Sequence, residues 1–307
     1  MERSVNRTRA ALSPSDRAGG TVPPATSGQR EFPFERRHFD FIAAMIYQLA
    51  GIHLAAHKVE MVYSRLARRL RDLHLKDFDA YCALLESDAA AREVNFLVNA
   101  LTTNLTSFFR ESHHFEHLAQ VVLPGVRQRQ AGASRPRLRI WSAGCSSGQE
   151  PYTIAMVVAH ALGGDIRRWD ARILATDIDT NMVDTARRGQ YPGDQAGSIP
   201  GPLRDRYTRR QRNGDGDPVI VMDDELKRLI TFKPLNLLEP WPMKGPFDAI
   251  FCRNVLIYFD RAGRTHVIEN FARLLSQDGY LFLGHSESLY GVSNSFQQAG
   301  PTIYRRL

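Results

Sequence analysis

A glutamate stands at the end of a short glycine-containing turn in the middle of the chain. The turn, Ser-Ala-Gly-Cys-Ser-Ser-Gly-Gln-Glu-Pro, runs from Ser142 to Pro151 and places Glu150 where a helix is expected to begin. Glycines let the backbone approach a ligand closely, and proline suits the first turn of a helix. The turn is neither a G-x-G-x-x-G fingerprint nor a phosphate-binding loop with its lysine. Because Glu150 would repel a pyrophosphate and attract a cation, we predict a cationic, phosphate-free ligand such as S-adenosylmethionine.

A second carboxylate closes an apolar run further along the chain. Asp177 ends the run 172–177, and Asp179 follows two residues later. A carboxylate at the end of a strand can accept hydrogen bonds from both hydroxyls of a ribose. The alternative is that Asp177 caps the next helix, a role that Asp179 could fill equally well. Taken together with the Glu150 turn, the pattern favours a ligand-binding role.

A third apolar run, 247–252, ends in the polar pair Arg253 and Asn254. Buried polar groups need partners, so this pair is poor core material. A capped turn would explain it, but the phenol of Tyr258 close behind favours a place in a reaction centre.

Alternating strands and helices are expected to position these residues. Strands are predicted at 138–142, 172–177, 247–252 and 279–283, with helices from about Pro151, over 181–188, and along the apolar face Val267, Ile268, Phe271, Leu274 and Leu275. The alternation predicts an α/β fold with a doubly wound, Rossmann-like parallel sheet that binds ligands at the carboxyl ends of its strands. It breaks down over 193–235, where Gly214-Asp215-Gly216 precedes Val219-Ile-Val221 and predicts a small inserted β-hairpin.

The first part of the chain has a different texture. Residues 1–33 are rich in Ser, Thr, Pro, Gly and Arg and predict a disordered tail. The segment 34–127 predicts a small all-helical domain. Its apolar positions recur at helical spacing in Val62, Leu66, Leu70 and Leu73, and again in Phe78, Tyr81, Leu84 and Leu85. The α/β domain is then expected over 128–307.

The composition is that of a soluble globular protein, with 43% hydrophobic and 24% charged residues among 307. No apolar run approaches the ~20 residues of a membrane span, and three scattered cysteines predict reduced thiols in a cytoplasm. His113 and His117 have the i, i+4 spacing of a zinc pair, but a third ligand is not evident and no metal is predicted. The net charge of +7 favours an acidic partner, which a nucleic acid, an anionic membrane or a glutamate-rich protein would satisfy.

Five motifs occur in order along the chain. They are Thr102-Thr-Asn-Leu-Thr-Ser-Phe-Phe-Arg110, Trp141-Ser-Ala-Gly-Cys-Ser-Ser-Gly-Gln-Glu-Pro-Tyr152, Thr176-Asp-Ile-Asp179, Phe247-Asp-Ala-Ile-Phe-Cys-Arg-Asn-Val-Leu-Ile-Tyr-Phe-Asp260 and Gly284-His-Ser-Glu287. Together they closely resemble the CheR family, the glutamate O-methyltransferases of chemotaxis receptors, over roughly residues 35–307. The resemblance implies a helical N-terminal domain and an S-adenosylmethionine-dependent methyltransferase domain with an inserted antiparallel β-subdomain.

The resemblance also implies roles for individual residues. The residues implied to bind the cofactor are Asn104, Thr106, Arg110, Glu150, Asp177, Asn236, Leu237, Asn254 and Val255. Arg110 and Tyr258 match residues of the reaction centre, and we expect them to orient the reactants. The implied reaction is attack by a glutamate carboxylate on the sulfonium methyl, which yields a γ-methyl ester and S-adenosylhomocysteine. Glutamate has a reference pKa near 4.3, so the nucleophile is already ionised at neutral pH and needs no general base.

Receptor recognition is assigned to two surfaces. Arg65, Arg68 and Arg69 are spaced to share one helix face, which is either a solvated surface or, as the resemblance implies, the face toward the receptor. Gly214 and Gly216 resemble the loop of family members that bind the receptor's C-terminal peptide as an added strand. The expected partner is therefore the cytoplasmic domain of a methyl-accepting chemoreceptor. This chain is expected to bind it as a monomer.

Two other functions remain as alternatives. A nucleic-acid methyltransferase would suit the positive charge. Amino-methylating DNA enzymes, however, usually carry a Pro-Pro-Tyr type motif where this chain has Arg253 to Tyr258, and no basic groove with interleaved aromatic residues is evident. No nucleic-acid partner is therefore predicted. The other alternative is a non-enzymatic, cofactor-sensing module that binds receptors.

Overall fold

The computed structural model describes residues 30–87 and 90–307, of which Phe32–Leu307 form one compact unit. Most of the predicted disordered tail therefore lies outside the described residues. The helical segment contains α1 (Arg36–Ala50), η1 (Ala56–Lys58), α2 (Val59–Asp72), α3 (Phe78–Glu86) and α4 (Ala91–Leu101). The prediction of an all-helical N-terminal domain is confirmed.

Side chains of this segment explain its helices locally. Asp77 caps α3 by accepting a hydrogen bond from the backbone N–H of Ala80 at 2.8 Å. Of the predicted stripe, Val62, Leu66 and Leu70 are completely buried in a core of their own, and Leu73 is half-buried against it. Helical spacing brought these residues to one face, and burial of that face stabilises the helices.

A seven-stranded sheet follows, in the order β6-β2-β1-β7-β8-β10-β9. Its strands are β1 (Arg137–Ala143), β2 (Asp170–Asp177), β6 (Ile230–Pro234), β7 (Phe247–Cys252), β8 (Leu275–Leu283), β9 (Phe296–Gly300) and β10 (Ile303–Arg306). The first five strands in that order are parallel, and β10 pairs antiparallel with both β8 and β9. The predicted doubly wound α/β fold is confirmed, with an antiparallel C-terminal edge that the sequence did not predict.

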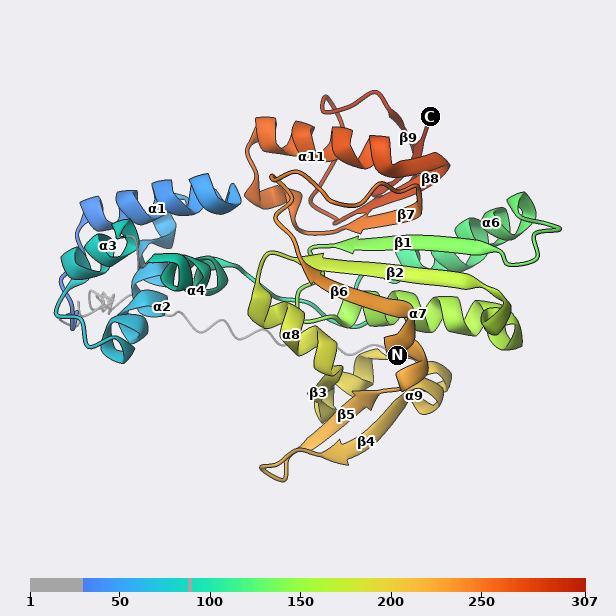
Figure 1. Ribbon diagram of the computed structural model, residues 1–307, viewed down its shortest axis with the longest axis horizontal. Helices are drawn as coiled ribbons and strands as arrows, with labels where there is room; N and C mark the ends of the chain where they lie inside the picture. The colour runs from blue at the N-terminus through green and yellow to red at the C-terminus, as the bar shows by residue number, and fades with distance from the viewer. Residues whose placement is uncertain (1–29, 88–89) are drawn as a thin grey trace, which may run out of the picture. The chain divides into compact units, whose positions relative to one another are not determined.

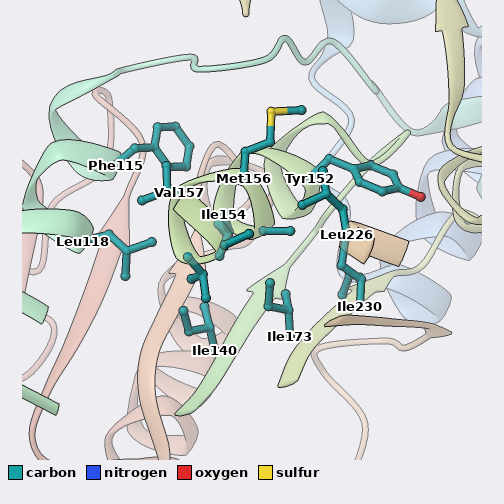
Figure 2. Close-up of a cluster of buried hydrophobic side chains, with 14 of the residues drawn as sticks. Phe115, Leu118, Ile140, Tyr152, Ile154, Met156, Val157, Ile173, Leu226 and Ile230 are labelled. Atoms are coloured by element: carbon teal, nitrogen blue, oxygen red, sulfur yellow. The ribbon is translucent and has the colours of Figure 1, made fainter. Parts of the chain in front are cut away.

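Helices cover both faces of this sheet (Figure 1). They are α5 (His113–His117), the π-helical turn η3 (Leu118–Val122), α6 (Leu123–Arg129), α7 (Gln149–Leu162), η4 (Gly163–Arg168), α8 (Thr180–Arg188), η6 (Leu256–Tyr258) and α11 (Arg261–Leu274). Residues of α7 share one core with Ile140 and Ile173 of the sheet (Figure 2), while α11 packs in a separate cluster with Trp141 and Ile250. The strands are therefore apolar on both sides, as in other parallel sheets.

The helices just before β1 belong to the α/β domain. Phe115 and Leu118 lie in the same core as Ile140 (Figure 2), together with Val126. The expected boundary at 127 thus falls too late, because these helices pack on the sheet and α4 ends at Leu101. An amphipathic helix shows the same periodicity whichever domain it covers.

The insertion also differs in extent from the expected hairpin. It is a three-stranded antiparallel sheet in the order β3-β5-β4, made of β3 (Gln190–Pro192), β4 (Thr208–Arg212) and β5 (Pro218–Met222). Three helical pieces accompany it, η5 (Gly193–Ser198), α9 (Gly201–Tyr207) and α10 (Asp224–Leu229). Residues 230–234, expected within the insertion, form β6 instead and pair with β2. Because β6 is short and follows an antiparallel sheet, its apolar residues gave no sign of which sheet they join.

Candidate active site

A cavity opens at the carboxyl ends of β1, β2 and β7. The residues predicted for the cofactor and the reaction centre all line it: Asn104, Thr106, Arg110, Glu150, Asp177, Asn236, Leu237, Asn254, Val255 and Tyr258. Parallel strands bring their carboxyl ends to one edge of the sheet, so segments far apart in sequence meet there.

Gly144 begins the turn after β1 and lies against Val255, which lines the same cavity. Its φ is +84, a conformation that favours glycine, and a Cβ at this position would lie 2.3 Å from Cγ2 of Val255. Gly148, with φ +100, is the N-cap of α7 and directs the chain into that helix. The two glycines thus bring the backbone close to Val255 and set Glu150 in the first turn of α7.

Gly144→Ala is expected to displace Val255 and narrow the cavity, so that the Kd for S-adenosylmethionine rises about tenfold or more. Isothermal titration calorimetry would measure this change. Gly132→Ala is a matched control because Gly132 has a similar φ, +89, but a Cβ added there would meet no atom within 4 Å. Equal cofactor affinity in both variants would contradict a role for the close approach at Gly144.

Glu150 is buried and belongs to a cluster of charges. Its carboxylate accepts hydrogen bonds from the Ser142 hydroxyl at 2.7 Å and from the Arg253 guanidinium at 3.0 Å. Burial raises the pKa of Glu150, and Arg253 opposes that rise. Arg253 also lies 3.4 Å from the Glu111 carboxylate. The cluster therefore holds two carboxylates and one guanidinium, of which Glu150 and Arg253 line the cavity and Glu111 lies behind them.

Asp177 is the carboxylate that ends β2 at the cavity. Burial raises the pKa of Asp177 to about 6. Its two oxygens accept one backbone N–H each, from Ser146 at 2.7 Å and from Asp179 at 2.9 Å, which leaves each oxygen able to accept another hydrogen bond. The cap of α8 is Asp179, whose side chain accepts the N–H groups of Asn181 and Met182 at the start of that helix. Asp177 is thus not the cap.

The segment between α4 and α5 contributes several residues to the cavity lining. The Asn104 side chain donates to Asp179 at 2.7 Å, and Thr102 donates to the same carboxylate at 2.9 Å. Arg110 is half-buried and donates to the carbonyl of Leu105 at 3.0 Å. Leu105 lines the cavity yet is 82% exposed, so an apolar side chain stands at its opening.

The turn after β7 is held from behind by Glu287. This carboxylate accepts the N–H groups of Asn254 and Val255 at 2.9 Å each, and that of Gly284 at 2.6 Å. Asn254 has a φ of +59, and the bonds to Glu287 support this unusual backbone. Glu287 does not line the cavity, so its role is structural.

Asn236 and Tyr258 connect the cavity with the end of α1. The Asn236 side chain donates to the carbonyl of Leu49 at 2.8 Å, and the Tyr258 carbonyl accepts the N–H of His53 at 3.1 Å. Ala50 and Ile52 complete the lining on this side. Sequence reasoning missed both, because apolar residues at or just after a helix end carry no signal of a distant site.

The arginines of α2 do not form the shared exposed face that was expected. Arg65 donates to the carbonyls of Ala100 and Thr102 at 2.9 and 2.7 Å, and Arg69 pairs with the buried Glu93 at 2.6 Å. Of the three predicted residues only Arg68 is exposed. Residues 34–127 carry eleven basic and eleven acidic side chains, so the excess positive charge of the chain lies elsewhere.

Gly214 and Gly216 lie in the turn between β4 and β5, away from the cavity lining. Gly216 has a φ of +87, and the Asn213 side chain accepts the N–H groups of Asp215 and Asp217. The turn residues therefore suit a tight hairpin. β4 is an edge strand of its sheet, with one side free for a further strand.

These groups fit S-adenosylmethionine. The carboxylate of Glu150 lines the cavity and can face a positive charge, which the cofactor carries on its ammonium and sulfonium groups. The unused acceptor positions of Asp177 suit ribose hydroxyls. An open sheet with this order, an acidic glycine turn after β1 and a carboxylate ending β2 defines an S-adenosylmethionine-dependent methyltransferase.

The chain belongs to the CheR family of methyltransferases. Residues 37–102 match the CheR methyltransferase all-alpha domain, and residues 104–305 match its SAM binding domain. The chain is 42% identical to chemotaxis protein methyltransferase 2 of Pseudomonas aeruginosa over 287 residues, 92% of this chain and 98% of that protein. It is 44% identical to the chemotaxis protein methyltransferase of Escherichia coli over 268 residues, 87% of this chain and 90% of that protein. The cofactor is S-adenosylmethionine.

Metal-binding side chains and membrane-spanning helices can be sought among the described residues. No group of three or more His, Cys, Asp or Glu side chains within 30–87 and 90–307 is arranged to hold a metal ion. None of the helices in the same part of the chain is long and apolar enough to cross a membrane.

Proposed function

We propose that this chain methylates glutamate side chains in the cytoplasmic domains of methyl-accepting chemoreceptors, acting in the cytoplasm as a monomer. The observation that carries the proposal is the cavity, which gathers from separate segments of the chain all the residues assigned to the cofactor and the reaction centre. The similarity to chemotaxis methyltransferases over most of the chain supports the choice of acceptor.

The residues of the cavity are suited to positioning rather than to proton transfer. When bound, S-adenosylmethionine supplies an electrophilic methyl group, and an ionised glutamate needs no general base to attack it. Arg110 and Tyr258 then orient the incoming carboxylate, with the guanidinium offering two parallel hydrogen bonds. Leu105 at the opening helps to exclude water from the reacting atoms.

The assignment of individual residues follows the contacts described above. Asp177 is proposed to accept the ribose hydroxyls and Glu150 to face the ammonium group. Asn104, Thr106, Arg110, Asn236, Leu237, Asn254 and Val255 complete the proposed cofactor site. Each lines the cavity, and several are held in place by hydrogen bonds to residues outside it.

The acceptor is tested by incubating the full chain with methyl-labelled cofactor and a purified receptor cytoplasmic fragment. We expect protein-bound label that base releases as volatile methanol, because a γ-glutamyl ester is base-labile. Duplex DNA in place of the receptor tests the nucleic-acid alternative, and no label should appear there. Bound cofactor without any transfer to receptor would instead support a cofactor-sensing module.

Receptor docking is proposed to use α2, with Arg68 as its exposed arginine. Arg65 and Arg69 support this role indirectly by holding α2 in place. Arg65 ties α2 to the end of α4, and Arg69 ties it to Glu93. Acidic side chains of a receptor bundle would complement Arg68 mainly by steering and orientation.

A receptor C-terminal peptide is proposed to add a strand to the inserted sheet, with the Gly214–Gly216 turn beside it. Backbone hydrogen bonds of the edge strand β4 would supply the affinity. Calorimetry with the C-terminal pentapeptide of a cognate receptor should give heat of binding that a scrambled pentapeptide does not. Identical traces for the two peptides would count against tethering while leaving methyl transfer untouched.

A further inference from the structure

The turn that carries Arg110 has an unusual backbone. Phe109 and Glu111, on either side of Arg110, have φ values of 55 and 58. Residues other than glycine rarely adopt this left-handed region, and such strain persists only where surrounding contacts hold it. Contacts with the surrounding residues must therefore hold this turn beside the cavity.

One buried guanidinium makes most of these contacts. The side chain of Arg253 is 3% exposed, and it donates to the backbone carbonyl of Arg110. The same group lies 3.4 Å from the Glu111 carboxylate and 3.0 Å from that of Glu150. A second contact, from the Phe109 N–H to the Thr153 hydroxyl at 3.2 Å, ties the turn to α7.

Arg253 therefore joins three parts of the site. It follows β7, it pairs with the carboxylate at the start of α7, and it holds both the carbonyl of Arg110 and the side chain of the next residue. A planar guanidinium can serve several acceptors at once in fixed geometry, whereas a lysine ammonium cannot reproduce that fork. Arg253 and Glu111 are thus suited to fix Arg110 relative to Glu150.

We propose that Glu111 and Arg253 form a positioning unit that sets the Arg110 turn against the Glu150 carboxylate. The proposal rests on the function given above, because it assumes that Arg110 faces the substrate. Glu111 does not line the cavity, so it acts through its neighbours. Its other oxygen lies 3.1 Å from the ring of His285, which holds the carboxylate from the solvent side.

The hydrogen-bonding capacity of the cluster is not fully used. Nε of Arg253 and Oε2 of Glu111 are buried without a hydrogen-bond partner. Nδ1 of His114 is also buried without a partner and lies 3.6 Å from the same Oε2, so the unmet hydrogen-bonding capacity gathers around the Glu111 carboxylate. His114, which faces the same cluster, is buried and has its pKa lowered to about 3 by that burial, so it adds no charge at neutral pH.

Glu111→Gln tests the unit with three measurements on the full chain. Hydrogen exchange of residues 105–112 without cofactor should become about fivefold faster or more, since the turn loses a charged partner. The turnover number for receptor methylation should fall about tenfold or more, because the misplaced guanidinium no longer aligns the reactants. The Kd for S-adenosylmethionine should change less than about threefold, because Glu150 and Asp177 are retained.

Two more variants separate positioning from general loss of fold. Arg253→Lys keeps a positive charge near Glu150 but loses the planar guanidinium that can donate to several acceptors at once. It should show the same faster exchange and lower turnover. Glu111→Asp keeps the carboxylate and should recover part of the turnover. Asp170→Asn removes a carboxylate paired with Arg139 at the far end of β2 and should change none of the three measurements.

Unchanged exchange of residues 105–112 in both Glu111→Gln and Arg253→Lys would overturn the proposal. So would a fall in turnover matched by an equal loss of cofactor affinity. If the wild-type chain does not methylate receptors, the proposed function fails, whereas the exchange and cofactor measurements still decide whether the unit holds the turn.

Discussion

Arg110→Ala should lower the turnover number for receptor methylation about 100-fold or more, with a smaller effect on cofactor affinity. Arg110 lines the cavity, and the only other arginine in the lining, among the residues that the structure describes, is Arg253, which is already engaged with Glu111 and Glu150. Losing one preorganised donor to reacting groups typically costs a factor of about 10²–10³. Single-turnover transfer of labelled methyl to a receptor fragment measures the effect on the transfer step.

Arg110→Lys and Arg135→Ala sharpen that result. Lysine keeps the charge but cannot donate two parallel hydrogen bonds to a carboxylate, so it should recover activity only partly. Arg135 is exposed just before β1, at the opposite end of the strand from the cavity, and its replacement should leave turnover unchanged. Wild-type turnover in Arg110→Ala would remove Arg110 from the reaction centre.

Asp177→Ala should raise the Kd for S-adenosylmethionine about 100-fold. The substitution removes the proposed acceptor for two hydroxyl groups, and it also frees the N–H groups of Ser146 and Asp179 that hold the turn after β1. Calorimetric titration would measure the loss. Asp184→Ala, an exposed aspartate of α8 paired with Arg187, serves as the control and should bind the cofactor normally. Similar affinities in the two variants would contradict the assignment of Asp177.

The acidity of Asp177 predicts a pH dependence for the same interaction. Burial raises its pKa to about 6, so acidification through that value protonates the carboxylate in the free protein. Cofactor affinity should therefore fall as the pH is lowered from about 8 to about 5, and Asp177→Asn should show a much flatter profile. Parallel profiles for the two proteins would show that another group is responsible.

Folding stability should respond to Asp177 in the opposite direction. Its folded-state pKa lies above the ordinary aspartate value of 3.8, so the folded chain takes up this proton at a higher pH than the unfolded chain does. The ionised carboxylate therefore costs folding free energy above about pH 6, and that cost is relieved as the pH falls toward 4. Other groups add their own contributions, so the free energy of unfolding is compared with that of Asp177→Asn at each pH.

The cavity residues were accessible to sequence reasoning because of the sheet. Glu150, Asp177 and Asn254 each follow an apolar run, and the strands that these runs form are parallel. Their carboxyl ends meet at one edge whatever the remaining packing, so local patterns were enough to bring them together. Motif resemblance added Asn104, Thr106 and Arg110, which precede the sheet.

Contacts between distant segments were not accessible in this way. Spacing alone placed Arg65 and Arg69 on a helix face with Arg68, but it could not show that Glu93 and the carbonyls at the end of α4 lie under that face. Charged residues on a helix have the same spacing along the sequence whether they face water or a buried partner. The apolar run of β6 was similarly ambiguous, because both a main-sheet strand and an insertion strand can be short.

The sequence by itself indicated the class of ligand and the edge of the sheet where the candidate site lies, because a glycine turn, its glutamate and a strand-ending aspartate are local features of an alternating chain. Only the tertiary structure decided that Asp179 rather than Asp177 caps α8, and that Arg253 joins Glu150 to the turn of Arg110. The physical reason is that charge pairing and burial depend on which side chains come within a few ångströms. That is a property of the packed chain and not of spacing along it.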